Sequence, residues 1–402
     1  MQLFTLRRLA VVCTFAFTAA APFADAAEWT TYQGDVGHTG YVPETLIATE
    51  TYLLWSANPQ PRGVGGLVVS DGLLITTPMQ NPVYQPQEPV VVTDAATGLT
   101  LWSVDFPNAT LSPVTVDAGA MYFQTNYNYY TGVTPYVYSY TLDGTLLWKT
   151  PYASNGARYL APVVADGAVF AGGGNSDGIY SFDAATGAVN WFTSLPQAEF
   201  WSPTWWRGKI LVHTNELDVL DETTGAKQIT MDDPTAYEFH HPAVMVVPPY
   251  AYVMKGAKLQ AYDLNTRTIA WSRTISNAGQ FWSEMATDGN ELFVIDNGLL
   301  TSVDPSTGAL LWYWRPAAPS TAVNSNVIVT LSHVIVSNMD HTYMISRDTH
   351  LTEKTLPVGG NNLAFGEGEL FIASDFTGIV YAFGVTEEFT VSCPTVVCPT
   401  GR

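Results

Sequence analysis

The sequence predicts an all-β protein, an eight-bladed β-propeller built from four-stranded antiparallel blades. Three observations predict it: a motif that recurs every 38 to 47 residues, a high aromatic content, and an incomplete copy of the motif at each end. Aromatic residues make up 13% of the 402 residues, and they are enriched in β-strands. We find no pattern typical of a long helix.

The recurring motif is clearest in DPSTGALLW, from Asp304 to Trp312. It is typical of a turn between two strands. Asp304 can accept hydrogen bonds from backbone N–H groups two or three residues further on. Gly308 provides a positive φ, which a residue with a Cβ resists. The strand that follows ends on Trp312, a large aromatic.

Other copies of the motif divide the chain into repeats. They are DAATGLTLW (94–102), LDGTLLW (142–148), DAATGAVNW (183–191), DETTGAKQI (221–229), DLNTRTIAW (263–271) and the degenerate SRDTHLTEK (346–354). The period matches one four-stranded propeller blade. Within the third repeat we predict strands over 161–164, 167–171, 178–182 and 188–191, separated by Gly-, Asp- and Asn-rich turns.

The incomplete copies predict how the ring closes. Residues 51–55 form an orphan fourth strand, and the last repeat, about 356–383, has only three strands. Together they make an eighth blade, and closure removes the sheet edges that an open array would expose. An open solenoid would leave both incomplete copies without a partner.

The first 26 residues are typical of a secretory signal peptide. Arg7 and Arg8 precede an apolar run over 9–21, and Ala24-Asp25-Ala26 is a cleavage motif. The alternative, a membrane anchor, needs about 20 apolar residues. We therefore predict three parts: a signal peptide (1–26, cleaved near Ala26), a propeller (27–388) and a tail (389–402). The mature chain has no transmembrane segment and is periplasmic or secreted.

Charge and cysteine content narrow the choice of partners. The formal net charge is −20, from 16 basic and 36 acidic residues. Such an acidic surface repels phosphate, which excludes nucleic acid as a partner. Cys393 and Cys398 are the two cysteines outside the signal peptide. In an oxidising compartment we expect them to pair with each other. An intermolecular bridge and a soft metal site are the alternatives.

The repeat D-x-x-T-G-x-x-x-W resembles that of the quinoprotein-type propellers, also called PQQ-like repeat proteins. The opening segment WTTYQGDVGHTGY (29–41) is similar to the start of such proteins. That family includes quinone-dependent dehydrogenases and non-enzymatic scaffolds such as the propeller of the bacterial outer-membrane assembly machine. The alcohol-oxidising dehydrogenases carry two adjacent cysteines over the cofactor, a pair that this sequence lacks. The resemblance therefore favours the scaffolds.

The resemblance also implies how the blades dock, because in that family the Trp of one blade stacks on the Gly-containing turn of a neighbour. The implied docking residues are Trp55, Gly98, Trp102, Trp148, Gly187, Trp191, Trp271, Gly308 and Trp312. Three copies depart from the pattern. Ile229 replaces the Trp in the fourth copy, Arg267 replaces the Gly in the fifth, and the seventh, which ends at Lys354, has lost both. We expect weaker docking around those blades.

A binding site is predicted at the channel mouth, on the loops that join one blade to the next. Three successive loops carry Phe followed by Trp or His: Phe200-Trp201, Phe239-His240 and Phe281-Trp282. Such aromatics are suited to anchor a flat ligand, a sugar or a partner's apolar side chain. The alternative is that they only pack the blades together. The candidate residues are Tyr159, Phe200, Trp201, Glu238, His240, His241, Phe281, Trp282, Asn324 and Asn361.

Metal-binding and catalytic signals are weak. A histidine of the pair at 240–241, with Glu238 or Glu284, can hold a proton or a metal, although a structural role suits it as well. Loops 175–178 and 338–340 offer oxygen ligands for calcium or magnesium but are also ordinary turns. No nucleophile elbow, zinc-protease motif or phosphate loop is present in the sequence.

The sequence therefore favours a non-enzymatic binding or scaffolding module of the bacterial cell envelope. Its partner would be an envelope or extracellular protein, or a small ligand at the channel mouth, with no cofactor. One alternative is a quinone-dependent oxidoreductase that uses pyrroloquinoline quinone with calcium. Another is a carbohydrate-binding propeller.

Overall fold

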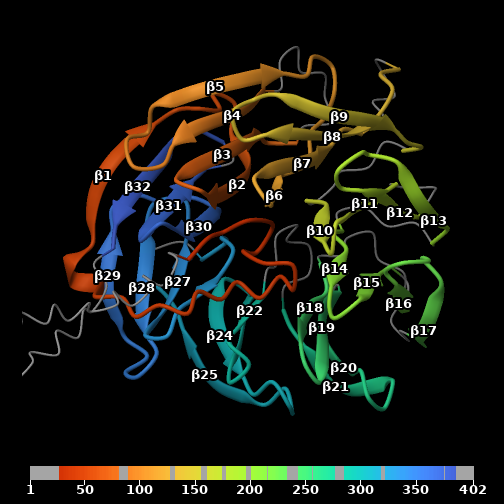
Figure 1. The fold of residues 1–402 in the computed structure, drawn as a ribbon. Coiled ribbons are helices and arrows are strands. Elements are labelled where there is room, and N and C mark those ends of the chain that lie inside the picture. Colours follow the sequence, from red (N-terminus) through yellow and green to blue (C-terminus); the bar gives the residue numbers. More distant parts are fainter. Residues whose placement is uncertain are drawn as a thin grey trace, which may run out of the picture.

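Eight four-stranded antiparallel sheets form a closed ring, which confirms the predicted eight-bladed propeller (Figure 1). The computed structural model describes residues 27–80, 89–126, 132–154, 161–173, 178–195, 201–214, 216–232, 243–255, 257–276, 285–317, 322–374 and 376–385. The predicted signal peptide and the cysteine-bearing tail lie outside these residues. No helix in the described part of the chain is long and apolar enough to cross a membrane.

Each of the first four blades follows the order of its strands in the sequence. Blade 1 holds β2 (Val64–Ser70), β3 (Leu73–Pro78), β4 (Pro89–Asp94) and β5 (Thr100–Asp105). Blade 2 holds β6 (Thr115–Asp117), β7 (Ala120–Gln124), β8 (Tyr136–Thr141) and β9 (Leu146–Pro151). Blade 3 holds β10 (Val163–Ala165), β11 (Ala168–Gly172), β12 (Ile179–Asp183) and β13 (Val189–Thr193). Blade 4 holds β14 (Thr204–Trp205), β15 (Lys209–His213), β16 (Glu216–Asp221) and β17 (Lys227–Asp232).

The next three blades repeat this order, and the eighth is made from both ends of the propeller. Blade 5 holds β18 (Met245–Val247), β19 (Tyr250–Lys255), β20 (Lys258–Asp263) and β21 (Thr268–Thr274). Blade 6 holds β22 (Met285–Thr287), β23 (Leu292–Asp296), β24 (Leu299–Val303) and β25 (Leu310–Trp314). Blade 7 holds β26 (Ile328–Val329), β27 (His333–Ser337), β28 (Thr342–Ser346) and β29 (Thr352–Leu356). Blade 8 holds β30 (Asn362–Gly366), β31 (Glu369–Ala373), β32 (Val380–Gly384) and β1 (Tyr52–Ala57), and a short 3₁₀ turn, η1 (Ala48–Glu50), precedes β1.

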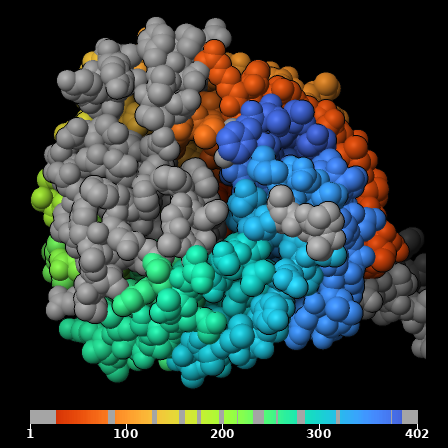
Figure 2. All heavy atoms as spheres, turned by 180° about the vertical axis from the view of Figure 1, so that it is seen from behind, coloured from red at the N-terminus to blue at the C-terminus, as the bar shows by residue number. Residues whose placement is uncertain are grey.

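The ring closes between β1 and β32, as the two incomplete repeats predicted. The strands pair antiparallel, from Tyr52 opposite Gly384 to Ala57 opposite Val380. Seen from behind, the orange-red N-terminal residues lie beside the blue C-terminal ones along one side of the molecule (Figure 2). In the third repeat the strands begin and end one or two residues later than predicted, a small displacement that leaves their order unchanged.

The turn before each outermost strand is fixed by local hydrogen bonds. In blade 3, Asp183 Oδ1 accepts bonds from the Thr186 backbone N–H at 2.8 Å and from the Thr186 hydroxyl at 2.7 Å. These bonds lower the pKa of the Asp183 carboxyl below its ordinary value, the hydroxyl having the larger effect. Gly187 then adopts a φ of 71°, the left-handed conformation that glycine reaches without a steric penalty.

The strand order defines two faces of the ring. Loops that join one blade to the next lie at the start of each first strand, and we call this side the loop face. The turns between first and second strands, and between third and fourth strands, lie on the opposite side, which we call the turn face. Antiparallel strands alternate in direction, so this division holds for every blade.

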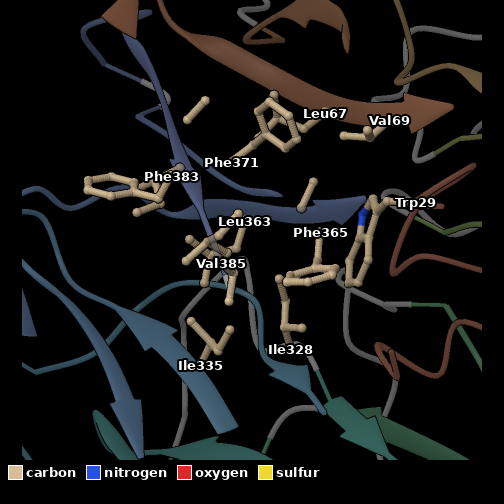
Figure 3. Packing of buried hydrophobic residues seen from close by; sticks show 14 of the residues in the cluster. Trp29, Leu67, Val69, Ile328, Ile335, Leu363, Phe365, Phe371, Phe383 and Val385 are labelled. Carbon is tan, nitrogen blue, oxygen red and sulfur yellow. The ribbon is translucent and has the colours of Figure 1, made fainter. Parts of the chain in front are cut away.

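The core consists of apolar clusters between neighbouring blades. The largest joins blades 7, 8 and 1 and includes Val69 of β2, Ile328 of β26 and Phe365 of β30. Trp29, which precedes every blade in the sequence, lies beside Phe365 in this cluster and is only 2% exposed (Figure 3). The N-terminal residues are therefore part of the core that closes the ring.

Candidate functional site

The N-terminal segment, residues 27–47, lies inside the ring at its turn face. In Figure 1 its red trace crosses the middle of the ring. Its backbone carbonyls accept hydrogen bonds from the first strands of blades 2, 4, 5, 6 and 7. Thr30 O accepts from Val116, Val36 O from Trp205, Gly37 O from Val246, Thr39 O from Thr287, and Gly40 O from Val329. With the bridge from Trp29 to Val69 and the bond from Glu367 to Ala27 O, the segment joins seven of the eight blades.

Buried polar side chains fix this segment in the channel. Gln33 is 4% exposed, and its Nε2 donates to Met285 O at 2.7 Å. Its Oε1 accepts a bond from Asn326 Nδ2 at 3.1 Å. Asn326 also bonds both backbone groups of Leu363, with Nδ2 donating to the carbonyl at 2.9 Å and Oδ1 accepting from the N–H at 2.7 Å. These bonds link blades 6, 7 and 8 through one segment.

His38 anchors the segment to blade 4. Its Nδ1 lies 2.7 Å from Tyr32 O and its Nε2 lies 2.9 Å from Pro203 O. Burial lowers the pKa of this imidazole, although the Pro203 and Tyr32 carbonyls and the Asp35 carboxylate oppose the change. A neutral imidazole can donate to only one of the two carbonyls at a time. Asp35 in turn accepts bonds from Gly37 and Thr39 and so holds the turn around His38.

A cavity of about 40 Å³ remains in the channel between the N-terminal segment and the first strands. Tyr32, Gln33, Asn326 and Asn362 line it with polar atoms, and the Gly65-Gly66 pair of β2 leaves it without side chains on that side. The cavity is far smaller than the roughly 300 Å³ of a typical small-molecule pocket. The cavity lies near the start of the first strands, toward the loop face, since Gly65 and Asn362 at the starts of β2 and β30 line it. The N-terminal segment covers the turn-face end of the channel.

Most of the residues predicted for the channel mouth lie outside the described residues. These are Tyr159, Phe200, Glu238, His240, His241, Phe281 and Trp282. Trp201 is described and is 3% exposed. Its ring packs with Phe170 and Ile210 between blades 3 and 4 and lies against Gly172. Trp201 thus has the packing contacts that the sequence left open as the alternative to ligand binding.

The two asparagines among the candidates lie close to the central polar network. The Asn324 N–H donates to Ser337 O at 3.0 Å, and Asn361 O accepts from the Asn326 N–H at 3.3 Å. Both are half-buried. Sequence reasoning did not find Gln33, His38 or Asn326. The only sequence signal was the resemblance of the opening segment to the start of PQQ-like repeat proteins, and it did not place that segment in the channel.

The same docking geometry recurs in five contacts between neighbouring blades. The Trp55 indole N–H donates to Ala95 O at 2.7 Å, and its ring lies against Gly98. The same two contacts join Trp102 to Leu142 and Gly144, Trp148 to Ala184 and Gly187, Trp191 to Glu222 and Gly225, and Trp271 to Pro305 and Gly308. Each Trp therefore docks on the turn of the following blade.

Two of the departures from the repeat face each other. Ile229 stands at the Trp position of blade 4, next to the blade 5 turn in which Arg267 replaces glycine. Ile229 packs against the cluster that contains Tyr262 of β20, and Leu264 of that turn packs against the same cluster. No indole ring therefore occupies the space opposite the turn. Arg267 keeps a positive φ of 61°. The two substitutions therefore belong to one altered junction.

The junction between blades 6 and 7 uses ionic contacts in place of the usual pair. Trp312 donates to Glu291 Oε2 at 2.7 Å and stacks on His350, with ring centroids 4.3 Å apart. Arg347 lies 2.7 Å from Asp288 and 3.4 Å from Glu291. Burial would raise the pKa of Asp288, but bonds from Arg347 and two backbone N–H groups lower it below its ordinary value. At blade 7, the Lys354 ammonium donates to Thr49 O, in η1.

The described residues offer no group of three or more His, Cys, Asp or Glu side chains placed to bind a metal ion. Of the two candidate oxygen-ligand loops, the first, 175–178, lies outside the described residues except for Gly178. In the other, Asn338 Oδ1 accepts the N–H groups of Asp340 and His341 at 2.9 and 2.8 Å. That arrangement is an Asx-turn.

An eight-bladed ring docked by Trp-on-turn contacts defines the class of PQQ-like repeat propellers. The family model described as "Outer membrane protein assembly factor BamB" matches residues 45–148, 134–277 and 255–353. The chain therefore belongs to this BamB family. No curated protein matches it significantly in sequence.

Solved structures of both functional kinds share the fold. BamB from Moraxella catarrhalis has a TM-score of 0.64 and 15% identity, covering 83% of this chain and 99% of its own. A europium-containing methanol dehydrogenase has a TM-score of 0.66 and 11% identity. The match covers 89% of this chain and 98% of the dehydrogenase chain. The quinohemoprotein alcohol dehydrogenase ADHIIG from Pseudomonas putida HK5 has a TM-score of 0.69 and 13% identity. The match covers 94% of this chain and 82% of the dehydrogenase chain. At these identities the likeness establishes the fold alone.

Proposed function

We propose that the protein is an exported, non-enzymatic scaffold of the cell envelope that binds a partner protein on its loop face. The observation that carries this proposal is the N-terminal segment, which bonds to seven blades and covers the turn-face end of the channel. A partner or ligand that uses the channel must then approach from the loop face. Membership of the BamB family supports a scaffolding role.

The partner site would be the aromatic wall of the channel mouth. Phe200, Phe281, Trp282 and Tyr159 are its proposed apolar anchors. Glu238, His240, His241, Asn324 and Asn361 would form its polar part. Large aromatics are the side chains that most often carry the binding energy of a protein interface. Because Trp201 is buried between blades 3 and 4, we assign it to the support of this wall and not to contact with the partner.

A pulldown from envelope extracts tests the proposal, with the wild-type chain compared against Trp282→Ala and the turn-face variant Leu351→Ala. Leu351 is an exposed apolar residue on the opposite face and serves as the matched control. We expect one partner to be recovered with wild type and Leu351→Ala but not with Trp282→Ala. Recovery by all three chains would place the interface elsewhere. Mass spectrometry of the mature N-terminus tests export, with cleavage expected after Ala26.

A quinone-dependent oxidoreductase is the competing function, since two of the similar structures are dehydrogenases. Two observations favour the scaffold over this alternative. The cavity of about 40 Å³ is small for a tricyclic quinone, and the sequence has no adjacent cysteine pair. Absorbance after incubation with pyrroloquinoline quinone and calcium, followed by dye-linked alcohol oxidation, decides between the two. A bound chromophore with turnover would overturn the scaffold proposal.

A further inference from the structure

Ala27, at the start of the N-terminal segment, contacts Glu44 near the segment's other end. The Ala27 backbone N–H donates to Glu44 Oε1 at 3.2 Å, although the two residues are 17 positions apart in the chain. Both residues are half-buried. In the uncleaved chain this nitrogen belongs to the peptide bond between Ala26 and Ala27, which is the bond that we expect to be cleaved on export.

This contact joins the two ends of a circuit inside the ring. Ala27 O accepts a hydrogen bond from the Glu367 N–H at 3.0 Å, in the turn between β30 and β31 of blade 8. Glu44 O accepts one from the Leu331 N–H at 2.9 Å, in the turn between β26 and β27 of blade 7. Between these two points the segment bonds to blades 1, 2, 4, 5, 6 and 7. Since blades 7 and 8 are neighbours, the bond from Ala27 to Glu44 closes the circuit.

Carboxylates lie on both sides of Ala27. Glu28 follows it in the sequence and Glu367 lies across the backbone hydrogen bond, and both carboxylates accept bonds from the turn between β2 and β3. Among the described residues, no Lys or Arg side chain forms an ion pair with Glu28 or Glu367. Burial, together with the Glu367 and Asp94 carboxylates, raises the pKa of Glu369 in the same turn region to about 7. A positive charge at Ala27 would therefore be attracted by its surroundings.

From this arrangement we infer that Glu44 is a binding site for the α-ammonium group that cleavage after Ala26 creates. A signal-peptide protease adds one water across the Ala26–Ala27 peptide bond. The products are a carboxylate on Ala26 and an amine on Ala27, and the amine takes up the proton that the new acid releases. The contact between an uncharged N–H and the Glu44 carboxylate thus becomes an ion pair, whose opposite charges attract more strongly where water is partly excluded.

The ion pair would couple processing of the chain to closure of the ring. Ala27 packs against the apolar cluster that joins blades 7, 8 and 1, and Trp29 lies within that cluster. A firmly held Ala27 therefore also keeps Trp29 in place. The start of the segment can open without unfolding of the whole propeller, and such local opening sets the rate of amide exchange. A chain that keeps its signal peptide lacks the charge, so its segment should open more often.

The test compares two purified chains, one that begins at Ala27 and one with two glycines added before Ala27. The glycines keep the Ala27 N–H but move the ammonium group up to about 7 Å away. Amide hydrogen exchange, followed by mass spectrometry, reports on the N–H groups of Glu367 and Val69, which bond to Ala27 and Trp29. We expect about fivefold faster exchange of both groups in the extended chain. Exchange at Thr287, which bonds to the middle of the segment, should not change.

Glu44→Gln tests the partner, because it removes the carboxylate charge and keeps an oxygen that can accept the hydrogen bond. In this variant, exchange at Glu367 should be equally fast with and without the added glycines. Glu50→Gln is the matched control, since it removes the same charge from an exposed residue of η1, and the fivefold difference should persist. Equal exchange in the two wild-type chains, or a difference that survives in Glu44→Gln, would overturn the inference.

This inference rests on the proposed export of the protein, and the two claims fail in different ways. A mature N-terminus other than Ala27, found by mass spectrometry of the exported chain, would overturn the cleavage step and with it the inference. Equal exchange in the two purified chains would overturn the ion pair alone. Neither result would affect the channel-mouth variants.

Discussion

Gly187→Ala should weaken the junction between blades 2 and 3. A Cβ added at this position would lie 2.4 Å from Trp148 Cε3 and 2.8 Å from Thr150 Oγ1. Trp148 is only 8% exposed, and its indole donates to Ala184 O at 2.9 Å. The ring therefore cannot move away without losing this hydrogen bond and its packing against the turn.

The cost has two parts. Alanine at the φ of 71° observed for Gly187 loses about 1 kcal/mol for backbone conformation alone. Displacing Trp148 adds about 1 to 2 kcal/mol for a strained hydrogen bond and looser packing. We therefore expect the free energy of unfolding to fall by about 2 to 3 kcal/mol.

Gly167→Ala is the matched control. Gly167 belongs to the same blade and has a φ of 76°, but nothing lies within 4 Å of its added Cβ. Its cost should be the backbone part only, about 1 kcal/mol. Urea unfolding followed by tryptophan fluorescence measures both variants. Equal losses would refute the idea that the Trp148 contact determines the difference.

Three more perturbations test other contacts. Arg267→Gly should raise the free energy of unfolding by about 1 kcal/mol, since the residue has a φ of 61° and no tryptophan opposite it; urea unfolding that shows a loss would contradict this. Burial and the nearby Glu367 and Asp94 raise the pKa of Glu369 to about 7, so its ionisation destabilises the fold as pH rises from about 4.5 to 7. Glu369→Gln should therefore raise the free energy of unfolding by about 1 kcal/mol at pH 8, after allowance for the partial exposure of the side chain, and should leave it unchanged at pH 4. An equal gain at pH 4 and pH 8, measured by urea unfolding, would exclude the carboxylate as the cause. Deleting residues 51–55 removes the closing strand, so calorimetry should show a broader transition at lower temperature, and an unchanged melt would show that closure contributes no stability.

The sequence predicted the repeat architecture well because one motif encodes a complete local structure. The Asp183 and Thr186 side chains hold the turn, and Gly187 allows its backbone conformation. Repeated along the chain, the motif indicates the number of blades. The incomplete copies indicated that β1 pairs with β32, because a single strand at one end and a three-stranded sheet at the other together make one complete blade.

The channel contents could not be predicted in the same way. Gln33 and His38 act through partners 252 and 165 residues away, and no periodic pattern connects them. In the sequence, Ile229 and Arg267 are separate departures from the motif, although they share one junction. Trp201 belongs to a repeated aromatic pattern in the loops, and that pattern is compatible both with a binding wall and with packing between blades. The burial of Trp201 depends on Gly172 in the adjacent strand, which the loop pattern does not reveal.

The position of the N-terminal segment bears on the order of events during synthesis. Ala27 to Glu44 emerge before any blade, yet their partners extend to Glu367, and β1 waits for β32. This segment is therefore made before the blades but is among the last parts of the propeller to find all of its contacts. Such sequence separation slows folding, and a chain released before blade 8 leaves an open edge that favours association with other chains. Only a chain with all eight blades can therefore form every hydrogen bond of residues 27–44.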